Sequence, residues 1–157
     1  MSLIVSPMTV ADLDAVMAIE VSAYGHPWTH GNFVDSLAAG YLACIARSEL
    51  ARCVGYYVAM PAVDEMHLLN LTVAPALQRC GHGRHLLQVL CGQCQARGLS
   101  RMLLEVRQSN TVARRLYARF GFDDIGLRPG YYPGDTGRRE DAVVMRLTME
   151  DRAHALD

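Results

Sequence analysis

The chain has 157 residues, of which 51% are hydrophobic and 20% charged, and its formal net charge is −1. This length suits one domain with a real core, and the composition is globular rather than disordered. The near-neutral charge provides no general basic field for nucleic acid, and no apolar run reaches the ~20 residues that a membrane helix needs.

In the first half of the chain, hydrophobic patterning predicts a strand at residues 3–8 and a helix at 9–24. Thr9 and Asp12 form a capping-box-like start to that helix. The segment "HPWT" breaks it, and a second, short helix is predicted at 30–40. Three β-rich runs follow at 41–48, 53–60 and 65–73.

The second half begins with a helix that opens at two glycines and runs to about residue 97, where Gly98 ends it. A strand at 101–106, a helix at 110–120, an extended segment at 122–132, a loop at 133–140 and a strand at 141–149 complete the chain. The order is β-α-α-β-β-β-α-β-α-β-β. We predict one α/β domain with a mixed sheet over residues 1–150, followed by a short tail at 151–157.

The segment "LTVAPALQRCGHGRHLLQVL", residues 71–90, places glycines and arginines between a strand and a helix. Gly81 and Gly83 permit close backbone approach, and the amides there lie at a helix N-terminus, which attracts anions. Arg79 and Arg84 add charge suited to phosphate. The pattern is neither a P-loop nor a complete GxGxxG motif. It predicts a pyrophosphate cradle; the alternative is a loop with an ordinary helix cap.

The same segment resembles a known family. "QRCGHG", Gln78 to Gly83, is similar to the Q/R-x-x-G-x-G/A signature of the GNAT acyltransferases. "LLEVRQSNTVARRLYARFGF", residues 103–122, resembles the second half of a GNAT core, and "HPWT" and "GYYPGDTGRREDAVVM" resemble the RimI subfamily. The resemblance covers nearly the whole chain. It implies the GNAT fold, acetyl-CoA as cosubstrate without a metal, and transfer to the N-terminal alanine of a small-subunit ribosomal protein.

The resemblance also implies roles for individual residues. In that subfamily a glutamate accepts a proton and a tyrosine donates one, and the matching positions here are Glu105 and Tyr117. The implied cofactor contacts are Leu71, Thr72, Val73, Gln78, Arg79, Cys80, Gly81, His82, Gly83, Arg84 and Asn110. Asn110 is also a good N-cap for the helix that follows.

From the residues alone, both catalytic positions have a structural alternative. Glu105 interrupts an apolar strand, where Arg107 on the same face would pair with it. Tyr117 lies beside the stripe made by Leu116 and Phe120, where a half-buried core tyrosine would be ordinary. Trp28, Tyr131 and Tyr132 are candidates to line a peptide channel, and Glu140 and Asp141 to hold a charged substrate end; each is equally well explained by packing or exposure.

Other signals point to competing functions. Cys91 and Cys94 form C-x-x-C, but they lie inside an amphipathic helix, which favours core packing over redox chemistry. Cys80, His82 and His85 match no zinc spacing. The five scattered cysteines suit reduced thiols, and residues 1–10 do not resemble a signal peptide. We therefore expect a cytoplasmic monomer without direct nucleic-acid or membrane contact. Another GNAT amine acceptor and a silent acetyl-CoA-binding module stay as alternatives.

Overall fold

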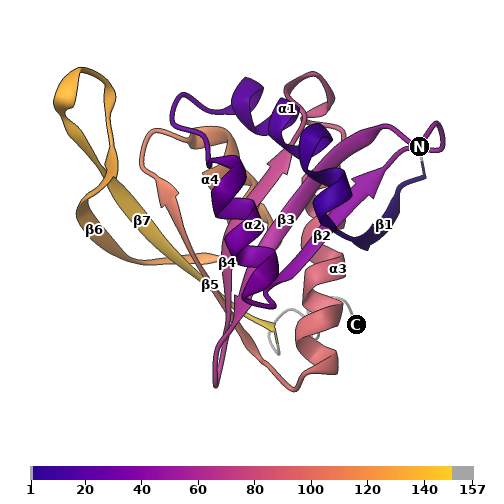
Figure 1. Ribbon diagram of the computed structural model, residues 1–157. Helices are drawn as coiled ribbons and strands as arrows, with labels where there is room; N and C mark the ends of the chain where they lie inside the picture. The colour runs from indigo at the N-terminus through magenta and orange to yellow at the C-terminus, as the bar shows by residue number, and fades with distance from the viewer. Residues whose placement is uncertain (1, 150–157) are drawn as a thin grey trace. The chain divides into compact units, whose positions relative to one another are not determined.

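The computed structural model describes residues 2–149, whose strands and α-helices follow the predicted order (Figure 1). The strands are β1 (Ile4–Pro7), β2 (Leu42–Arg47), β3 (Cys53–Pro61), β4 (Met66–Val73), β5 (Arg101–Arg107), β6 (Asp123–Pro133) and β7 (Arg139–Thr148). The helices are α1 (Leu13–Ala23), α2 (His30–Ala38), α3 (His82–Ala96) and α4 (Thr111–Phe120), with 3-10 turns η1 (Val10–Asp12), η2 (Pro75–Leu77) and η3 (Asp135–Gly137). The predicted tail at 151–157 lies outside the described residues.

The chain forms two compact units. The first contains the residues up to 61 together with 69–90, and the second contains 62–68 and the residues from 91 onward. β4 runs from the second unit into the first, so each unit holds part of this strand. One domain over residues 1–150 stays a prediction. No helix within residues 2–149 has the length and apolar character required to span a lipid bilayer.

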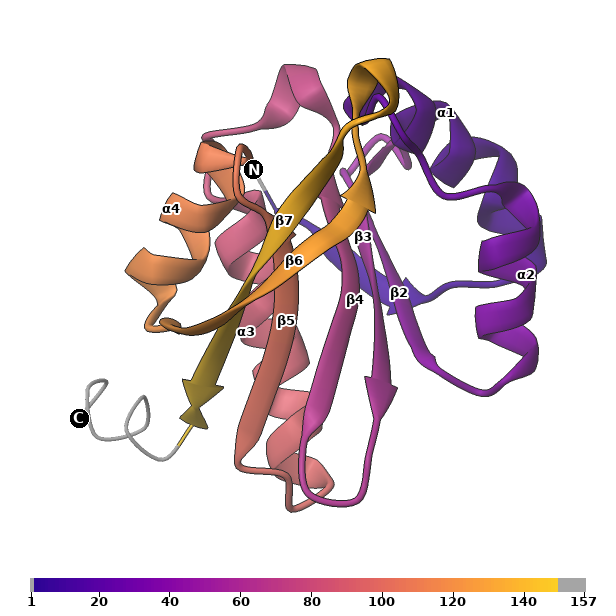
Figure 2. The same ribbon diagram turned by 90° about the vertical axis from the view of Figure 1, so that its left-hand side faces the viewer.

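In the first unit, three strands form an antiparallel ladder. β1 pairs with β2 and β2 pairs with β3, with Ile45 opposite Tyr56 in the second pair. Helices α1 and α2 lie over β2 and β3 (Figure 2). The predicted capping box is present, since the Thr9 N–H donates to the Asp12 carboxylate at 2.8 Å. Thr29 caps α2 in the same way, with Asn32 as its partner.

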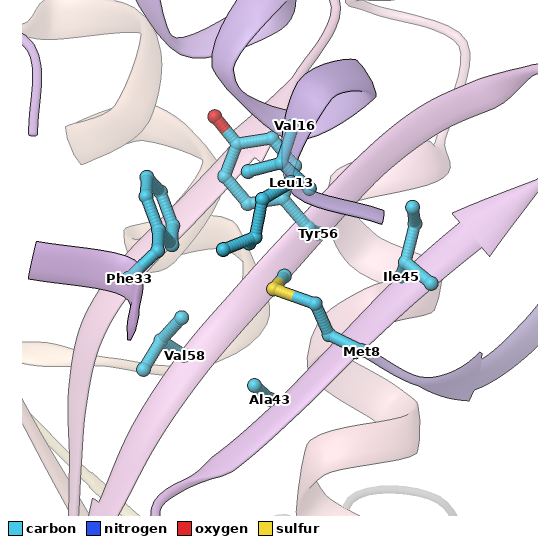
Figure 3. Close-up of a cluster of buried hydrophobic side chains, with 8 residues drawn as sticks. All are labelled: Met8, Leu13, Val16, Phe33, Ala43, Ile45, Tyr56 and Val58. Carbon is cyan, nitrogen blue, oxygen red and sulfur yellow. The ribbon is translucent and has the colours of Figure 1, made fainter. Parts of the chain in front are cut away.

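The core of the first unit joins these helices to the strands (Figure 3). Its buried side chains are Met8, Leu13, Val16, Phe33, Ala43, Ile45, Tyr56 and Val58. Phe33 packs edge-on against Tyr56 with ring centroids 5.8 Å apart. Leu13 and Val16 lie three residues apart on one face of α1, and Tyr56 and Val58 lie two residues apart on one face of β3, so the two surfaces can pack together.

In the second unit the sheet is mixed. Met66 to Leu68 of β4 run parallel to β5, while β5 and β6 are both antiparallel to β7. The parallel pair needs a crossover connection, which contains α3. The prediction of an α/β chain with a mixed sheet is therefore confirmed.

Two details of the second unit differ from the sequence prediction. The loop predicted at 133–140 is shorter, because Tyr132 pairs with Glu140 and Pro133 with Arg139, which lengthens the β6–β7 hairpin. On α4, Tyr117 and Phe120 are the buried residues, whereas Leu116 is only half-buried. The buried face of α4 thus contains Tyr117 and Phe120, where the sequence predicts Leu116 and Phe120.

Gly55 in β3 tests the packing of the first unit. A Cβ at this position would lie 2.5 Å from the Thr72 carbonyl oxygen and 3.2 Å from Cα of Val73. Because both are backbone atoms, Gly55→Ala should lower the free energy of unfolding by about 1–3 kcal/mol, measured by urea titration. Gly92→Ala is the control: that position in α3 is open, so the better helix former should add about 0.5–1 kcal/mol. Equal effects of the two substitutions would contradict this packing.

Candidate functional site

Glu105 on β5 carries two partners on its carboxylate. Its Oε2 is 2.5 Å from Nε2 of His67 on β4, and its Oε1 is 3.5 Å from Nε of Arg128 on β6. The side chain of Glu105 is 6% exposed, whereas that of His67 is 25% exposed. A carboxylate so far from water needs such partners, since burying an unpaired charge is costly.

The strand register explains why these side chains meet. His67 lies opposite Leu103 in the parallel β4–β5 pair, and Glu105 is two residues further along the same face of β5. His67 and Glu105 are therefore diagonal neighbours on one surface. The structural alternative for Glu105, a pair with Arg107, is not seen: Arg107 instead donates to Glu140 at 3.1 Å and to the carbonyl of Pro133 at 2.8 Å.

The surroundings of Glu105 keep it ionised. Burial by itself would raise the pKa of Glu105, but the hydrogen bond from His67 and the charge of Arg128 outweigh burial and lower the pKa. Because a base becomes weaker as its pKa falls, Glu105 held between these two partners is by itself a poor acceptor for a proton near neutral pH.

The β6–β7 hairpin brings aromatic and charged side chains to the same unit. The rings of Tyr131 and Tyr132 meet edge-on with centroids 4.9 Å apart, and the Arg128 guanidinium lies 5.7 Å from the Tyr131 ring. Burial, followed by Tyr131 and Glu105, raises the pKa of Tyr132. Asp141 accepts a hydrogen bond from the Gly130 N–H at 2.8 Å, so it fixes the hairpin backbone.

Tyr117 and Asn110 belong to α4. Tyr117 is buried, and its ring packs against Phe122 at 5.5 Å. The side chain of Asn110 accepts from the N–H of Ala113 at 3.2 Å, which confirms the predicted N-cap. Tyr117 thus packs in the core of its unit, and its role as proton donor stays a prediction.

In the first unit, the glycine segment opens α3. Arg79 and Gly81 have φ of 64° and 85°, which turns the chain into the helix that begins at His82. The first helical hydrogen bond runs from the N–H of His85 to the Gly81 carbonyl, so the amides before it lack intrahelical partners. Arg79 and Arg84 are exposed. Free amides, a helix N-terminus and two cations suit a pyrophosphate, as the sequence predicts.

The strand before this segment has part of its backbone already engaged. Tyr24 donates to the Leu71 carbonyl at 3.3 Å, and Gln78 donates to the Val73 carbonyl at 3.2 Å. The hydroxyl of Thr72 is buried and donates to Asn70 at 2.7 Å. Backbone contacts from these residues to a pantetheine arm stay a prediction.

A buried carboxylate in the first unit was missed by the sequence analysis. Glu20 of α1 is 1% exposed and accepts from the Tyr56 hydroxyl at 2.6 Å, Asn70 at 3.1 Å and the Trp28 N–H at 2.9 Å. Its position four residues after Val16, on the apolar face of α1, was the available signal. The ring of Trp28 packs at 5.1 Å from Phe33, so this residue belongs partly to the core.

The cysteine alternatives lose support. Cys91 and Cys94 are buried in α3, which confirms core packing, and burial raises the pKa of Cys94 to about 12. A thiol with so high a pKa is a poor redox nucleophile. Among residues 2–149, no three His, Cys, Asp or Glu side chains gather as metal ligands would.

The family is decided by comparison of the sequence. Residues 13–122 match the family model described as "Acetyltransferase (GNAT) family". The chain belongs to the GNAT acetyltransferase family. The predicted resemblance is thereby confirmed at the level of the family.

Individual relatives resemble this GNAT chain over most of its length. The [Ribosomal protein bS18]-alanine N-acetyltransferase of Haemophilus ducreyi is 40% identical over 136 residues, which is 87% of this chain and 93% of that protein. The enzyme of the same name from Escherichia coli K12 is 35% identical over 143 residues, covering 91% and 95%. The crystal structure of the Escherichia coli ribosomal-protein-S18-alanine N-acetyltransferase has a TM-score of 0.85 at 34% identity and covers 94% of each chain.

The hydrogen bond between Tyr56 and Glu20 allows a direct test of the buried network. Tyr56→Phe leaves the carboxylate short of one donor, so the free energy of unfolding should fall by about 1–3 kcal/mol in urea titration. Tyr41→Phe is the control, since Tyr41 is half-buried against the same core. A loss at Tyr56 no larger than that at Tyr41 would show that the network adds little stability.

Proposed function

We propose that this protein transfers the acetyl group of acetyl-CoA to the α-amine of the N-terminal alanine of ribosomal protein bS18. The observation that carries the proposal is the similarity to enzymes named for that reaction, at 35–40% identity over 87–91% of the chain. The likeness in structure to the Escherichia coli enzyme supports it.

The chemistry of the acceptor agrees with the residues present. An α-amine has a pKa of ~7.7–8.0, against ~10.4 for a lysine side chain, so a larger fraction of it is neutral near pH 7. Such an acceptor needs only modest help in losing a proton. Glu105 and the side chains that contact its carboxylate can provide this help. The neutral amine then attacks the thioester directly, in a ternary complex without an acyl-enzyme.

In this reaction the predicted cofactor, catalytic and peptide-binding residues have separate tasks. The segment from Gln78 to Arg84 binds the pyrophosphate through its free amides and cations, which the α3 N-terminus supports. Glu105 is the carboxylate that assists removal of the proton from the amine, which its contacts with His67 and Arg128 support. Tyr117 donates a proton to the departing thiolate. The acceptor peptide contacts Trp28, Tyr131, Tyr132 and Asp141.

A peptide assay tests substrate and carboxylate together. With a hexapeptide that copies the mature bS18 N-terminus, wild type should release thiol from acetyl-CoA, and Glu105→Gln should lower kcat by ~100-fold or more. Glu49→Gln, the same exchange at an exposed turn position, should not change kcat. A peptide with a blocked N-terminus should give no release.

Each other outcome has a defined meaning. Equal rates with the free and the blocked peptide would point to a lysine acceptor and contradict the proposal. Acetyl-CoA binding without release on any amine would favour a silent binding module. Full activity of Glu105→Gln would leave the substrate in place and remove the carboxylate from the chemistry.

The pyrophosphate segment is tested separately through KM. Arg84→Gln removes one cation from the start of α3, so the KM for acetyl-CoA should rise about tenfold while kcat changes little. Arg52→Gln, at an exposed position in the turn between β2 and β3, is the charge-matched control. The effect of Arg84→Gln should shrink at high salt, and an unchanged KM would exclude Arg84 from the site.

A further inference from the structure

His67 is a titratable side chain to which the predicted mechanism gives no part. It lies on β4 with Nε2 at 2.5 Å from Oε2 of Glu105. We propose that His67 is a further catalytic residue: its imidazole takes the proton from the acceptor amine, and Glu105 positions the ring and stabilises the imidazolium. This inference rests on the proposed function and refines the task given there to Glu105.

Access to solvent favours His67 over Glu105 as the group that meets the amine. The side chain of Glu105 is 6% exposed, and both of its oxygens already face a partner, His67 on one side and Arg128 on the other. The side chain of His67 is 25% exposed. The amine therefore reaches the imidazole more readily than the carboxylate behind it.

The hydrogen bond also fixes which ring nitrogen is available. An ionised carboxylate only accepts, so the Nε2–H of His67 donates to Glu105 and Nδ1 is left as an acceptor. The lowered pKa of Glu105 agrees with an ionised carboxylate at this contact. General bases work best when their pKa is near the working pH, and ordinary imidazoles, at ~6.5, are closer to it than carboxyl groups, at ~4.3.

The proton balance of the step is complete. One N–H bond of the α-ammonium breaks and an N–H bond forms at Nδ1 of His67, which gives a neutral amine and an imidazolium. The amine forms the new C–N bond, and the C–S bond breaks. The second amine proton goes to the departing thiolate through the acid that the mechanism supplies. His67 then releases the first proton to solvent.

Charged side chains also lie on the strands next to His67 and Glu105. Glu105 faces His67 from β5, and Arg128 on β6 faces the other oxygen of Glu105. On β7, Arg146 pairs with Leu103, which is the residue opposite His67 on β5. The Glu105 carboxylate thus balances the imidazolium that forms, and Arg128 is the cation in contact with that carboxylate.

His67→Gln separates the two roles that this side chain could have. Glutamine can still donate a hydrogen bond to Glu105 but cannot take up a proton. With the bS18 hexapeptide, kcat of His67→Gln should fall ~100-fold or more, while the KM for acetyl-CoA should stay unchanged. In His67→Gly, added imidazoles should restore turnover, and the restored rate should rise with the basicity of the imidazole.

A spectroscopic measurement completes the test without turnover. In ¹⁵N-histidine-labelled wild type at neutral pH, NMR should find His67 with a proton on Nε2 and none on Nδ1, and Glu105→Gln should alter this distribution. Wild-type activity retained by His67→Gln, rescue that ignores imidazole basicity, or a proton on Nδ1 would each overturn the inference. Failure of wild type to acetylate the peptide would instead overturn the proposed function, so the two failures are distinguishable.

Discussion

A carboxylate can be buried in a protein only if protein groups replace the water it loses. Among the described residues, this constraint applies to Glu20 on α1 in the first unit and to Glu105 on β5 in the second. In the first, three donors from α1–α2, β3 and β4 surround Glu20. In the second, His67 and Arg128 flank Glu105. Loss of any one donor would leave a buried carboxylate oxygen without a partner, which costs folding free energy. The strands and helices that supply the donors therefore have to keep their relative positions within each unit.

The two carboxylates differ in what surrounds them, and this separates their roles. Glu20 is enclosed by neutral donors and fixes the segment that leads to Trp28. Glu105 has an imidazole and a guanidinium as partners, and the imidazole is partly exposed. Of these two arrangements, only the second contains an imidazole, the side chain that most often takes part in proton transfer. The chemistry is therefore expected at Glu105, and Glu20 is a structural feature.

Local signals were enough to predict much of this structure. Strand and helix order followed from periodicity and from glycine and proline positions, and the Asn110 cap from its residue type and spacing. The partner of Glu105 could not be predicted, because His67 is 38 residues away in sequence and meets it through the β4–β5 register. The hydrogen bonds of Glu20 join residues up to 50 positions apart, which local sequence patterns do not reveal. The local sign was the position of Glu20 itself, a carboxylate on the apolar face of α1.

We propose acetylation of the N-terminal α-amine of ribosomal protein bS18. The most direct measurement is intact-mass and fragment mass spectrometry of full-length bS18 from the same organism, after incubation with the enzyme and acetyl-CoA. We expect a single acetyl group on the N-terminal alanine. Acetylation confined to lysine side chains, or an unmodified bS18 beside an enzyme that acetylates another amine, would contradict it.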